Sequence, residues 1–328
     1  MVYIKSLSKE IWPGYIPPYQ DELFSSWFFR LAGNHKIKTY SFSKEKLGAI
    51  PIWNRDSDMY YSKKLIKKLV LHTPLNEKRI KSLFLNSYEG YLFEKVNTSG
   101  KSKGILPLGI YHRYRKRKGL LFCPRCLKER KYFKKEWRLS SSIVCLKCNS
   151  FLQDSCPKCN KPIVFHRLDI KNKSELLDNE ITNCYNCLYD LSMSPVLSPN
   201  IKYIQYQKCI NKTLYQGYNN ISNYSFSYFF VLFRLCNLLG ANSLIWNKFS
   251  SYFRDKYESF GLNEVSHREF DYCDIKARRV LLYEAYFLLK DFPVNFKKFV
   301  NENRINYTDF WRDDNNRLPF FIYDILKT

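Results

Sequence analysis

The sequence has no hydrophobic stretch long enough to cross a membrane. Its best apolar segment, 226–239, is interrupted by Arg234 and falls short of the roughly 18 residues that a membrane-spanning helix needs. Residues 1–18 are rich in charge and proline and lack the apolar core of a secretory signal. We therefore expect a cytoplasmic protein without membrane contact, whose cysteines stay reduced.

The loops and side-chain groupings of common enzymes are also missing. The chain contains neither a Gly-x-x-x-x-Gly-Lys-Ser/Thr loop nor a Gly-x-Gly-x-x-Gly loop, and its five histidines are scattered outside any nucleophile motif. Asp56 and Asp58 form an acidic doublet that a two-metal nuclease could use, but no third carboxylate is marked beside them. Capping of the helix that follows is the simpler interpretation. We expect no enzyme activity.

What the chain does have is eight cysteines in four Cys-x-x-Cys motifs. Two intervening residues let a tight turn direct both thiolates at one ion, and zinc takes four such ligands in a tetrahedron. Pairing the motifs in sequence order predicts two closed sites for structural Zn²⁺: Cys123, Cys126, Cys145 and Cys148 in the first, and Cys156, Cys159, Cys184 and Cys187 in the second. Crossed pairing, giving one interleaved module, is the alternative.

Three further cysteines lie outside these motifs. Cys209, Cys236 and Cys273 are single and lie in apolar patterns, as expected of small buried residues. Disulfides do not suit a reducing compartment, and a thioredoxin-like redox pair would be single rather than fourfold. His166 lies seven residues beyond Cys159 and could be a further ligand, although the cysteines already suffice.

A strong positive charge points to nucleic acid as a partner. The formal net charge is +24, and residues 1–120 hold 23 Lys and Arg against 9 Asp and Glu. A dense basic stretch interleaved with tyrosines and phenylalanine crosses the first zinc motif, and a solvated basic surface is the alternative to DNA contact. The candidate DNA-binding residues are Arg113, Arg115, Lys116, Arg117, Lys118, Arg125, Lys128, Arg130, Lys131, Lys134, Lys135 and Arg138.

Helical periodicity predicts a mainly α fold with small β elements. Near the N-terminus we expect helices over 21–33, with Asp21 and Glu22 in its first turn, and over 58–71 and 76–87, the last capped by Asn76. Residues 97–119 are predicted to be a loop. Near the C-terminus, helices are expected over 226–239, 276–289 and 293–300.

These segments suggest three domains. Residues 1–110 are expected to form a helix-turn-helix-like domain with an extended arm at 1–20, residues 111–195 a pair of four-cysteine zinc ribbons in series, and residues 196–328 an all-α domain. The arm carries Trp12, Tyr15, Ile16 and Tyr19, which could anchor it on a partner protein. Alternatively, the arm packs back over the helix at 21–33.

Several motifs together resemble the TniQ (TnsD-like) family of transposition proteins. They are the stretch 18–27 with Arg30-Leu31-Ala32, the segment 53–58, Phe122-Cys123-Pro124-Arg125-Cys126-Leu127, Glu136-Trp137-Arg138-Leu139, and the cysteine motifs up to about residue 190. The resemblance implies a non-catalytic, bacterial, nucleoid-associated adaptor that binds double-stranded DNA and selects the target site of a Tn7-like transposon.

The resemblance also implies partners. Such adaptors recruit an AAA+ ATPase of the TnsC/TniB type, and some work with a CRISPR effector complex and its guide RNA, in certain cases as homodimers. Two rival functions share parts of the pattern: a zinc-ribbon transcription regulator or RNA-binding protein, and a nuclease that uses Asp56 and Asp58.

Overall fold

The computed structural model is mainly helical with a few short strands, as the sequence predicts. It describes residues 10–97, 102–112, 114–170, 173–174, 176–240, 248–249, 252–253, 270–311 and 318–326. Contacts divide the chain into two compact units: 1–87, 108–138 and 153–197 form the first, and 88–107, 139–152 and 198–328 form the second. The three domain boundaries expected from the sequence stay a prediction. Within the described residues, no helix is both long and apolar enough to span a bilayer.

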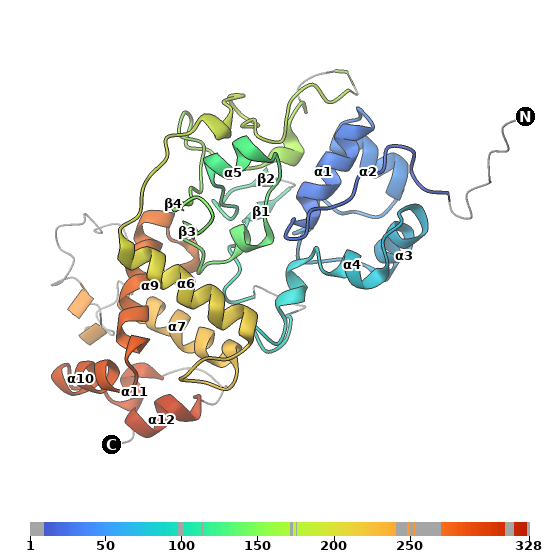
Figure 1. Cartoon of the computed structure of the whole chain (residues 1–328). Helices are drawn as coiled ribbons and strands as arrows, with labels where there is room; N and C mark the ends of the chain where they lie inside the picture. The colour runs from blue at the N-terminus through green and yellow to red at the C-terminus, as the bar shows by residue number, and fades with distance from the viewer. Residues whose placement is uncertain are drawn as a thin grey trace, which may run out of the picture. The chain divides into compact units, whose positions relative to one another are not determined.

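The first unit begins with four helices and a 3₁₀ turn. They are α1 (Phe24–Asn34), α2 (Thr39–Leu47), α3 (Lys63–His72), α4 (Glu77–Lys81) and η1 (Leu85–Tyr88) (Figure 1). Ser62 caps α3 by accepting from Leu65 N–H, and Asn76 caps α4 by accepting from Arg79 N–H. The predicted role of Asn76 is therefore confirmed. Helix α2 was not predicted, because its residues carry almost no one-sided apolar pattern.

Two predicted helix starts are wrong. Helix α1 begins at Phe24 rather than residue 21, because Leu23 is extended and donates its N–H to the Phe133 carbonyl at 2.9 Å. Asp21 and Glu22 therefore do not lie in the first turn. Helix α3 begins at Lys63 rather than residue 58, and Asp56 and Asp58 do not cap it. The predicted helix over 76–87 is the short α4 followed by η1.

An aromatic core holds these helices together. Phe24, Trp27 and Phe28 from α1 are fully buried beside Phe42 and Phe84. The Phe24 and Phe84 rings stack with centroids 4.3 Å apart, and Phe28 and Phe42 pack at 5.3 Å. Phe24, Trp27 and Phe28 therefore lie on the buried face of α1.

The rest of the first unit consists of short pieces. They are β1 (Ile110–Tyr111), β2 (Tyr114–Arg115), α5 (Pro124–Glu129), and the 3₁₀ turns η2 (Lys135–Arg138), η3 (Phe165–Arg167) and η4 (Leu191–Met193). Strands β1 and β2 pair antiparallel, with Ile110 opposite Arg115. The segment 97–119, predicted to be a loop, thus contains a hairpin.

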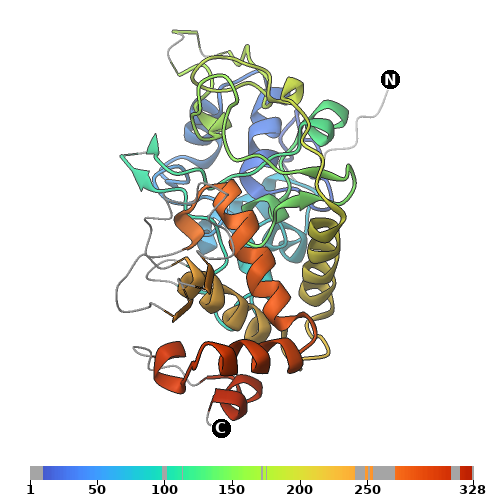
Figure 2. The same cartoon turned by 90° about the vertical axis from the view of Figure 1, so that its left-hand side faces the viewer.

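The second unit is built around packed helices. It comprises β3 (Val144–Cys145), β4 (Ser150–Phe151), α6 (Ile201–Gln216), α7 (Ser225–Leu239), η7 (Phe270–Tyr272), α9 (Ile275–Lys290), α10 (Val294–Glu302), α11 (Tyr307–Phe310) and α12 (Phe320–Leu326). Helices α6, α7 and α9 pack on one another, and α10 lies against α9 (Figure 2). The three C-terminal helices predicted from periodicity are confirmed within one or two residues as α7, α9 and α10.

Candidate metal centres and nucleic-acid interface

The second cysteine group is built from two turns of the same geometry. In one, Asn160 N–H donates to Cys156 O at 2.8 Å, and in the other, Leu188 N–H donates to Cys184 O at 2.9 Å. Asn160 and Leu188, which directly follow the second cysteine of each motif, both have positive φ, at 55° and 58°. In these turns the backbone N–H groups of Lys158 and Cys159 donate to the Cys156 thiol, and those of Asn186 and Cys187 donate to the Cys184 thiol.

The sulfur positions in this group suit a tetrahedral ion. Cys156 Sγ lies 3.6 Å from Cys187 Sγ, and Cys159 Sγ lies 3.6 Å from Cys184 Sγ. Four thiolates about 2.3 Å from one zinc lie about 3.8 Å apart at the corners of a tetrahedron. The same distances exclude disulfides, whose sulfurs are about 2.05 Å apart.

The first cysteine group contains Cys123, Cys126, Cys145 and Cys148, whose sulfur atoms all lie within 4.8 Å of one another. Pro124 occupies the first turn of α5, so Cys123 is the N-cap residue and Cys126 lies inside the helix. Cys145 ends strand β3, and Asn149, with φ of 46°, follows Cys148 in the turn to β4. Three of these four cysteines are buried.

Both groups follow the sequence order that the spacing predicts, and the crossed pairing is not seen among the described residues. Either group could hold one metal ion, and the donor set of four thiols fits a structural zinc. Four thiolates close the coordination shell, so neither site leaves a position for a catalytic water. His166 belongs to neither group.

A buried ion-pair cluster lies within the first unit. The guanidinium of Arg138, which is 1% exposed, donates to Asp56 Oδ2 at 2.6 Å and to Asp58 Oδ2 at 3.1 Å. Asp58 also accepts from the N–H and hydroxyl of Ser25 at 2.8 and 3.0 Å. The two carboxylates that a nuclease would need are therefore engaged by an arginine.

The two carboxylates of this cluster differ in acidity. Burial raises the pKa of Asp58 to about 6, and the neighbouring Asp56 carboxylate acts in the same direction against the charge of Arg138. Burial also opposes ionisation of Asp56, but the Arg138 guanidinium holds the pKa of Asp56 below its ordinary value. Arg138 thus pairs more strongly with Asp56.

His166 is part of the same buried region. Its ring stacks on Trp53 with centroids 4.7 Å apart and planes 2° from parallel. Burial, together with the charges of Arg115 and Arg167, lowers the pKa of His166 well below its ordinary value. A neutral, stacked imidazole is a packing group, so the alternative role of His166 as a metal ligand is wrong.

Two of the candidate DNA-binding arginines are buried, which corrects their assignment. Arg138 is held by Asp56 and Asp58. Arg115 is 6% exposed and donates from Nη2 to the carbonyls of Trp53 and Arg55, each at 3.2 Å. Neither can reach a phosphate, because both guanidinium groups are used inside the protein. Arg113 lies outside the described residues.

The remaining basic candidates lie at or near the surface. Lys134 is 15% exposed and pairs with Asp21, and Lys131 pairs with Glu180. Burial and the charge of Arg79 lower the pKa of Lys135 to about 8. The exposed candidates are Lys116, Arg117, Arg125, Lys128, Arg130 and Lys131, whereas Lys118, Lys134 and Lys135 are half-buried.

Comparison with known families gives a specific result. Residues 13–152 match the family model TniQ. The chain carries a TniQ domain. A search of curated proteins found no match to the chain. The resemblance expected from the motifs is thus confirmed, and a TniQ domain implies a DNA-binding protein associated with transposition.

The TniQ match ends before the last two cysteine motifs begin. It includes the first cysteine group and the whole of the Arg138 cluster, whereas the second cysteine group, Cys156 to Cys187, lies beyond residue 152. The resemblance quoted to about residue 190 is therefore shown only as far as 152.

The described part of the N-terminal arm, 10–20, packs against the helices of the first unit. Trp12 is 6% exposed, stacks on His72 with centroids 5.5 Å apart, and donates its backbone N–H to the His72 carbonyl. The Ile16 carbonyl accepts from Trp27 Nε1 at 2.9 Å. These residues follow the alternative expectation, an arm that packs back on its own chain, and Trp12 cannot anchor a partner because it is buried in the core of the first unit.

Tyr15, Ile16 and Tyr19 are half-buried on the same surface. Tyr15 and Ile16 pack against the aromatic core, and the Tyr19 ring stacks on Tyr132 with centroids 4.3 Å apart. The Arg30 guanidinium lies 4.4 Å from the Tyr19 ring centre. Part of each side chain still faces solvent.

Sequence reasoning missed what the motif at 18–30 does inside the TniQ domain. Glu22 is completely buried, and Arg30 donates to its two carboxylate oxygens at 2.8 and 2.7 Å. The Ser26 hydroxyl and the Tyr19 N–H donate to the same carboxylate. Glu22 and Arg30 are eight residues apart, which in a continuous helix would separate them by about 12 Å, so their spacing gave no signal of an ion pair.

Proposed function

We propose that this chain is a non-catalytic adaptor that binds double-stranded DNA at a transposition target site and recruits an AAA+ ATPase of the TnsC/TniB type. The observation that carries the proposal is the TniQ match over residues 13–152. Two closed cysteine groups, each suited to a structural Zn²⁺, and an exposed basic surface support it.

DNA binding is proposed for the exposed basic residues alone. Lys116 and Arg117 follow strand β2, while Arg125 and Lys128 lie on α5 beside the first cysteine group. Fixed turns place these charges close together along the chain, which suits contact with a phosphate backbone. Such contacts orient a protein on the duplex without reading its sequence.

The absence of catalysis is part of the proposal. Asp56 and Asp58 are the acidic doublet that suggested a nuclease, and both are paired with Arg138. Within the described residues, no third group of metal-binding side chains joins them. Incubation of supercoiled plasmid with the protein and Mg²⁺ should leave the plasmid uncut, and nicking that Asp56→Asn abolishes would contradict this.

Recruitment of the ATPase is proposed through the face around Tyr15, Ile16 and Tyr19. Tyr15 and Tyr19 are half-buried aromatic side chains and Ile16 is a half-buried aliphatic one, and each keeps a solvent-facing part that could anchor a partner. In a pull-down with the ATPase of the same transposon, Tyr19→Ala should lose binding while its zinc content stays unchanged. Binding equal to wild type would move the docking face elsewhere.

Target selection could be direct or guided by a CRISPR effector complex and its guide RNA. Direct selection requires that the purified chain prefer its attachment sequence over unrelated duplex. Guided selection requires binding to the effector, with no sequence preference by the chain alone. A zinc-ribbon regulator or RNA-binding protein, the rival function, would bind no transposition ATPase in either case.

A further inference from the structure

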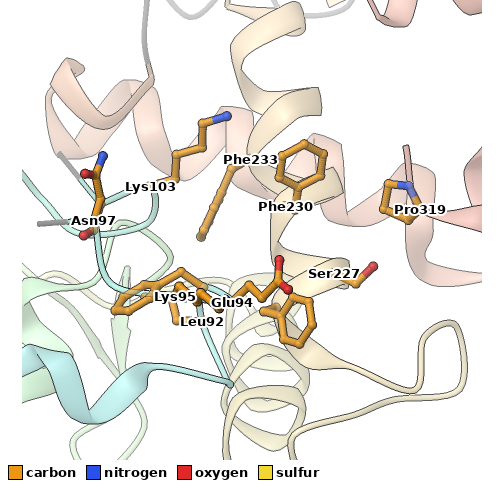
Figure 3. Close-up of a pocket in the computed structure, with 12 residues that line it drawn as sticks. Leu92, Glu94, Lys95, Asn97, Lys103, Ser227, Phe230, Phe233 and Pro319 are labelled. Carbon is orange, nitrogen blue, oxygen red and sulfur yellow. The ribbon is translucent and has the colours of Figure 1, made fainter. Parts of the chain in front are cut away.

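The second unit contains a pocket that the proposed function does not use. Its volume is about 590 Å³, within the range of sites that hold a drug-sized group. Its apolar lining includes Leu92, Phe93, Phe226, Phe230 and Phe233. Figure 3 shows Leu92, Glu94 and Lys95 on one side of the opening and Phe230, Phe233 and Lys103 on the other.

The aromatic wall of the pocket is built on a helix. Phe226, Phe230 and Phe233 lie on α7 at positions i, i+4 and i+7, so they share one face. Behind the wall, the buried Phe233 ring stacks on Phe270 with centroids 5.3 Å apart. This packing fixes the wall in place, so the pocket is formed before a ligand arrives.

Polar groups complete the lining. Lys103 Nζ lies 5.1 Å from the centre of the Phe230 ring, and the exposed Glu94 and Lys95 stand at the opening. Ser102 is only 8% exposed, and its hydroxyl has no hydrogen-bond partner among the described residues. Leaving a buried hydroxyl without a partner is unfavourable, so a ligand that offers this hydroxyl an acceptor would bind more tightly.

We propose that this pocket binds an aromatic side chain presented by an acidic segment of a partner protein. Phenylalanine rings favour an aromatic guest through stacked and edge contacts. The two lysines against one glutamate favour an acidic flank, and a backbone carbonyl of the segment could accept from Ser102. A nucleobase suits the site less well, because the phenylalanine rings offer its polar edge no hydrogen bonds and Asn97, Ser102 and Ser227 could satisfy that edge only in part.

The pocket also combines two parts of the chain. Residues 92–103 lie within the TniQ match, whereas the α7 wall and Pro319 lie outside it. The partner would therefore be selected in part by residues beyond the TniQ match. Neither the basic surface nor the Tyr19 face takes part, so binding at this pocket does not depend on the proposed function.

The test uses fluorescent pentapeptides and the full zinc-loaded chain. Fluorescence anisotropy should give Asp-Glu-Phe-Asp-Glu a dissociation constant roughly 30-fold lower than that of Asp-Glu-Ala-Asp-Glu, the ratio expected for one anchoring aromatic. Ser227→Trp, which places a large side chain in the opening, and Lys103→Glu should each weaken the phenylalanine peptide about tenfold or more. Lys276→Glu, an exposed lysine on α9, is the matched charge control and should bind as wild type does.

Other outcomes would overturn the assignment. Equal affinity for the phenylalanine and alanine peptides, or unchanged binding by both pocket variants, would mean that no aromatic anchor enters the pocket. Binding of a labelled five-nucleotide thymidine strand that Ser227→Trp abolishes would assign the pocket to nucleic acid instead. Duplex DNA affinity should be unchanged in Ser227→Trp, which separates this test from that of the proposed function.

Discussion

Arg138 Nη2 lies 2.6 Å from Asp56 Oδ2, across 82 residues of sequence and inside the first unit. The two residues come from two of the motifs that resemble TniQ, 53–58 and 136–139. Those motifs are therefore joined by a buried ion pair, which explains them as structural elements rather than as a DNA-binding or catalytic site.

Loss of this ion pair should destabilise the protein strongly. Arg138→Met leaves two carboxylates buried without their partner, and breaking a buried pair on one side costs about 3–5 kcal/mol. Urea unfolding with zinc present should give that decrease in the free energy of unfolding. Arg130→Met, at an exposed position, is the control and should change it by less than about 0.5 kcal/mol. Equal stability of the two variants would disprove the structural role of Arg138.

Asp58 should give stability an unusual pH dependence. Its pKa is about 6 in the folded protein, above its ordinary value of 3.8, so the unfolded chain loses this proton first as pH rises. The Asp58 contribution to the free energy of unfolding should therefore decrease between about pH 4 and pH 6, by roughly 3 kcal/mol in all. The measurement is wild type minus Asp58→Asn at each pH, which cancels the common effect of acid on the cysteine groups. A difference that stays flat, or rises with pH, would contradict the buried arrangement.

Metal content should follow the two cysteine groups independently. Protein purified without chelator should carry two zinc ions per chain by elemental analysis. Cys126→Ser and Cys187→Ser should each lower the count to one, since each removes a ligand from a different group. Chelation should unfold the surrounding turns, because a structural zinc contributes about 10 kcal/mol or more of apparent binding free energy. One zinc or none in the wild-type protein would refute the assignment.

DNA affinity should depend on exposed charges and not on the buried arginines. Lys116→Glu with Arg117→Glu should weaken binding to every duplex and lower the slope of log K against log salt by about 0.9 for each phosphate that the variant no longer neutralises. Lys208→Glu with Lys212→Glu, two exposed lysines on α6, is the matched control. If both double variants lose affinity equally, the effect is one of net charge, and the stretch is only a solvated surface.

Trp12 should behave as a core residue. Truncation of a buried tryptophan costs about 3–5 kcal/mol, so Trp12→Ala should lower the free energy of unfolding by that order. Trp12→Phe keeps a ring over His72 and should cost less. A stable Trp12→Ala variant that loses only ATPase binding would restore the extended arm predicted from the sequence.

The features that the sequence predicted well are those with a repeated spacing. Four Cys-x-x-Cys motifs led to the grouping that the structure brings together, and the apolar repeats of α7, α9 and α10 located those helices. Local spacing suffices in both cases, because the partners are set by short turns or by one helix face.

Burial of charge was not predictable in the same way. Arg115 and Arg138 look in the sequence like their exposed neighbours. They are buried because each hydrogen-bonds to residues 62 and 82 positions away, respectively. Trp12 was misassigned for a similar reason, since its partner His72 lies 60 residues further on. The phenylalanines that line the pocket on α7 can be seen in the sequence at helical spacing. Nothing in the sequence indicated that residues 92–103 would form another part of the same lining.

The central claim, that this chain brings a transposition ATPase to DNA, can be tested by mapping where the ATPase loads. A duplex carrying one binding site for the chain would be incubated with the AAA+ ATPase of the same transposon and a nucleotide, with and without the chain, and then footprinted. We predict an ATPase footprint that begins beside that of the chain and disappears when the chain is omitted. An ATPase footprint of equal strength and position without the chain would contradict it.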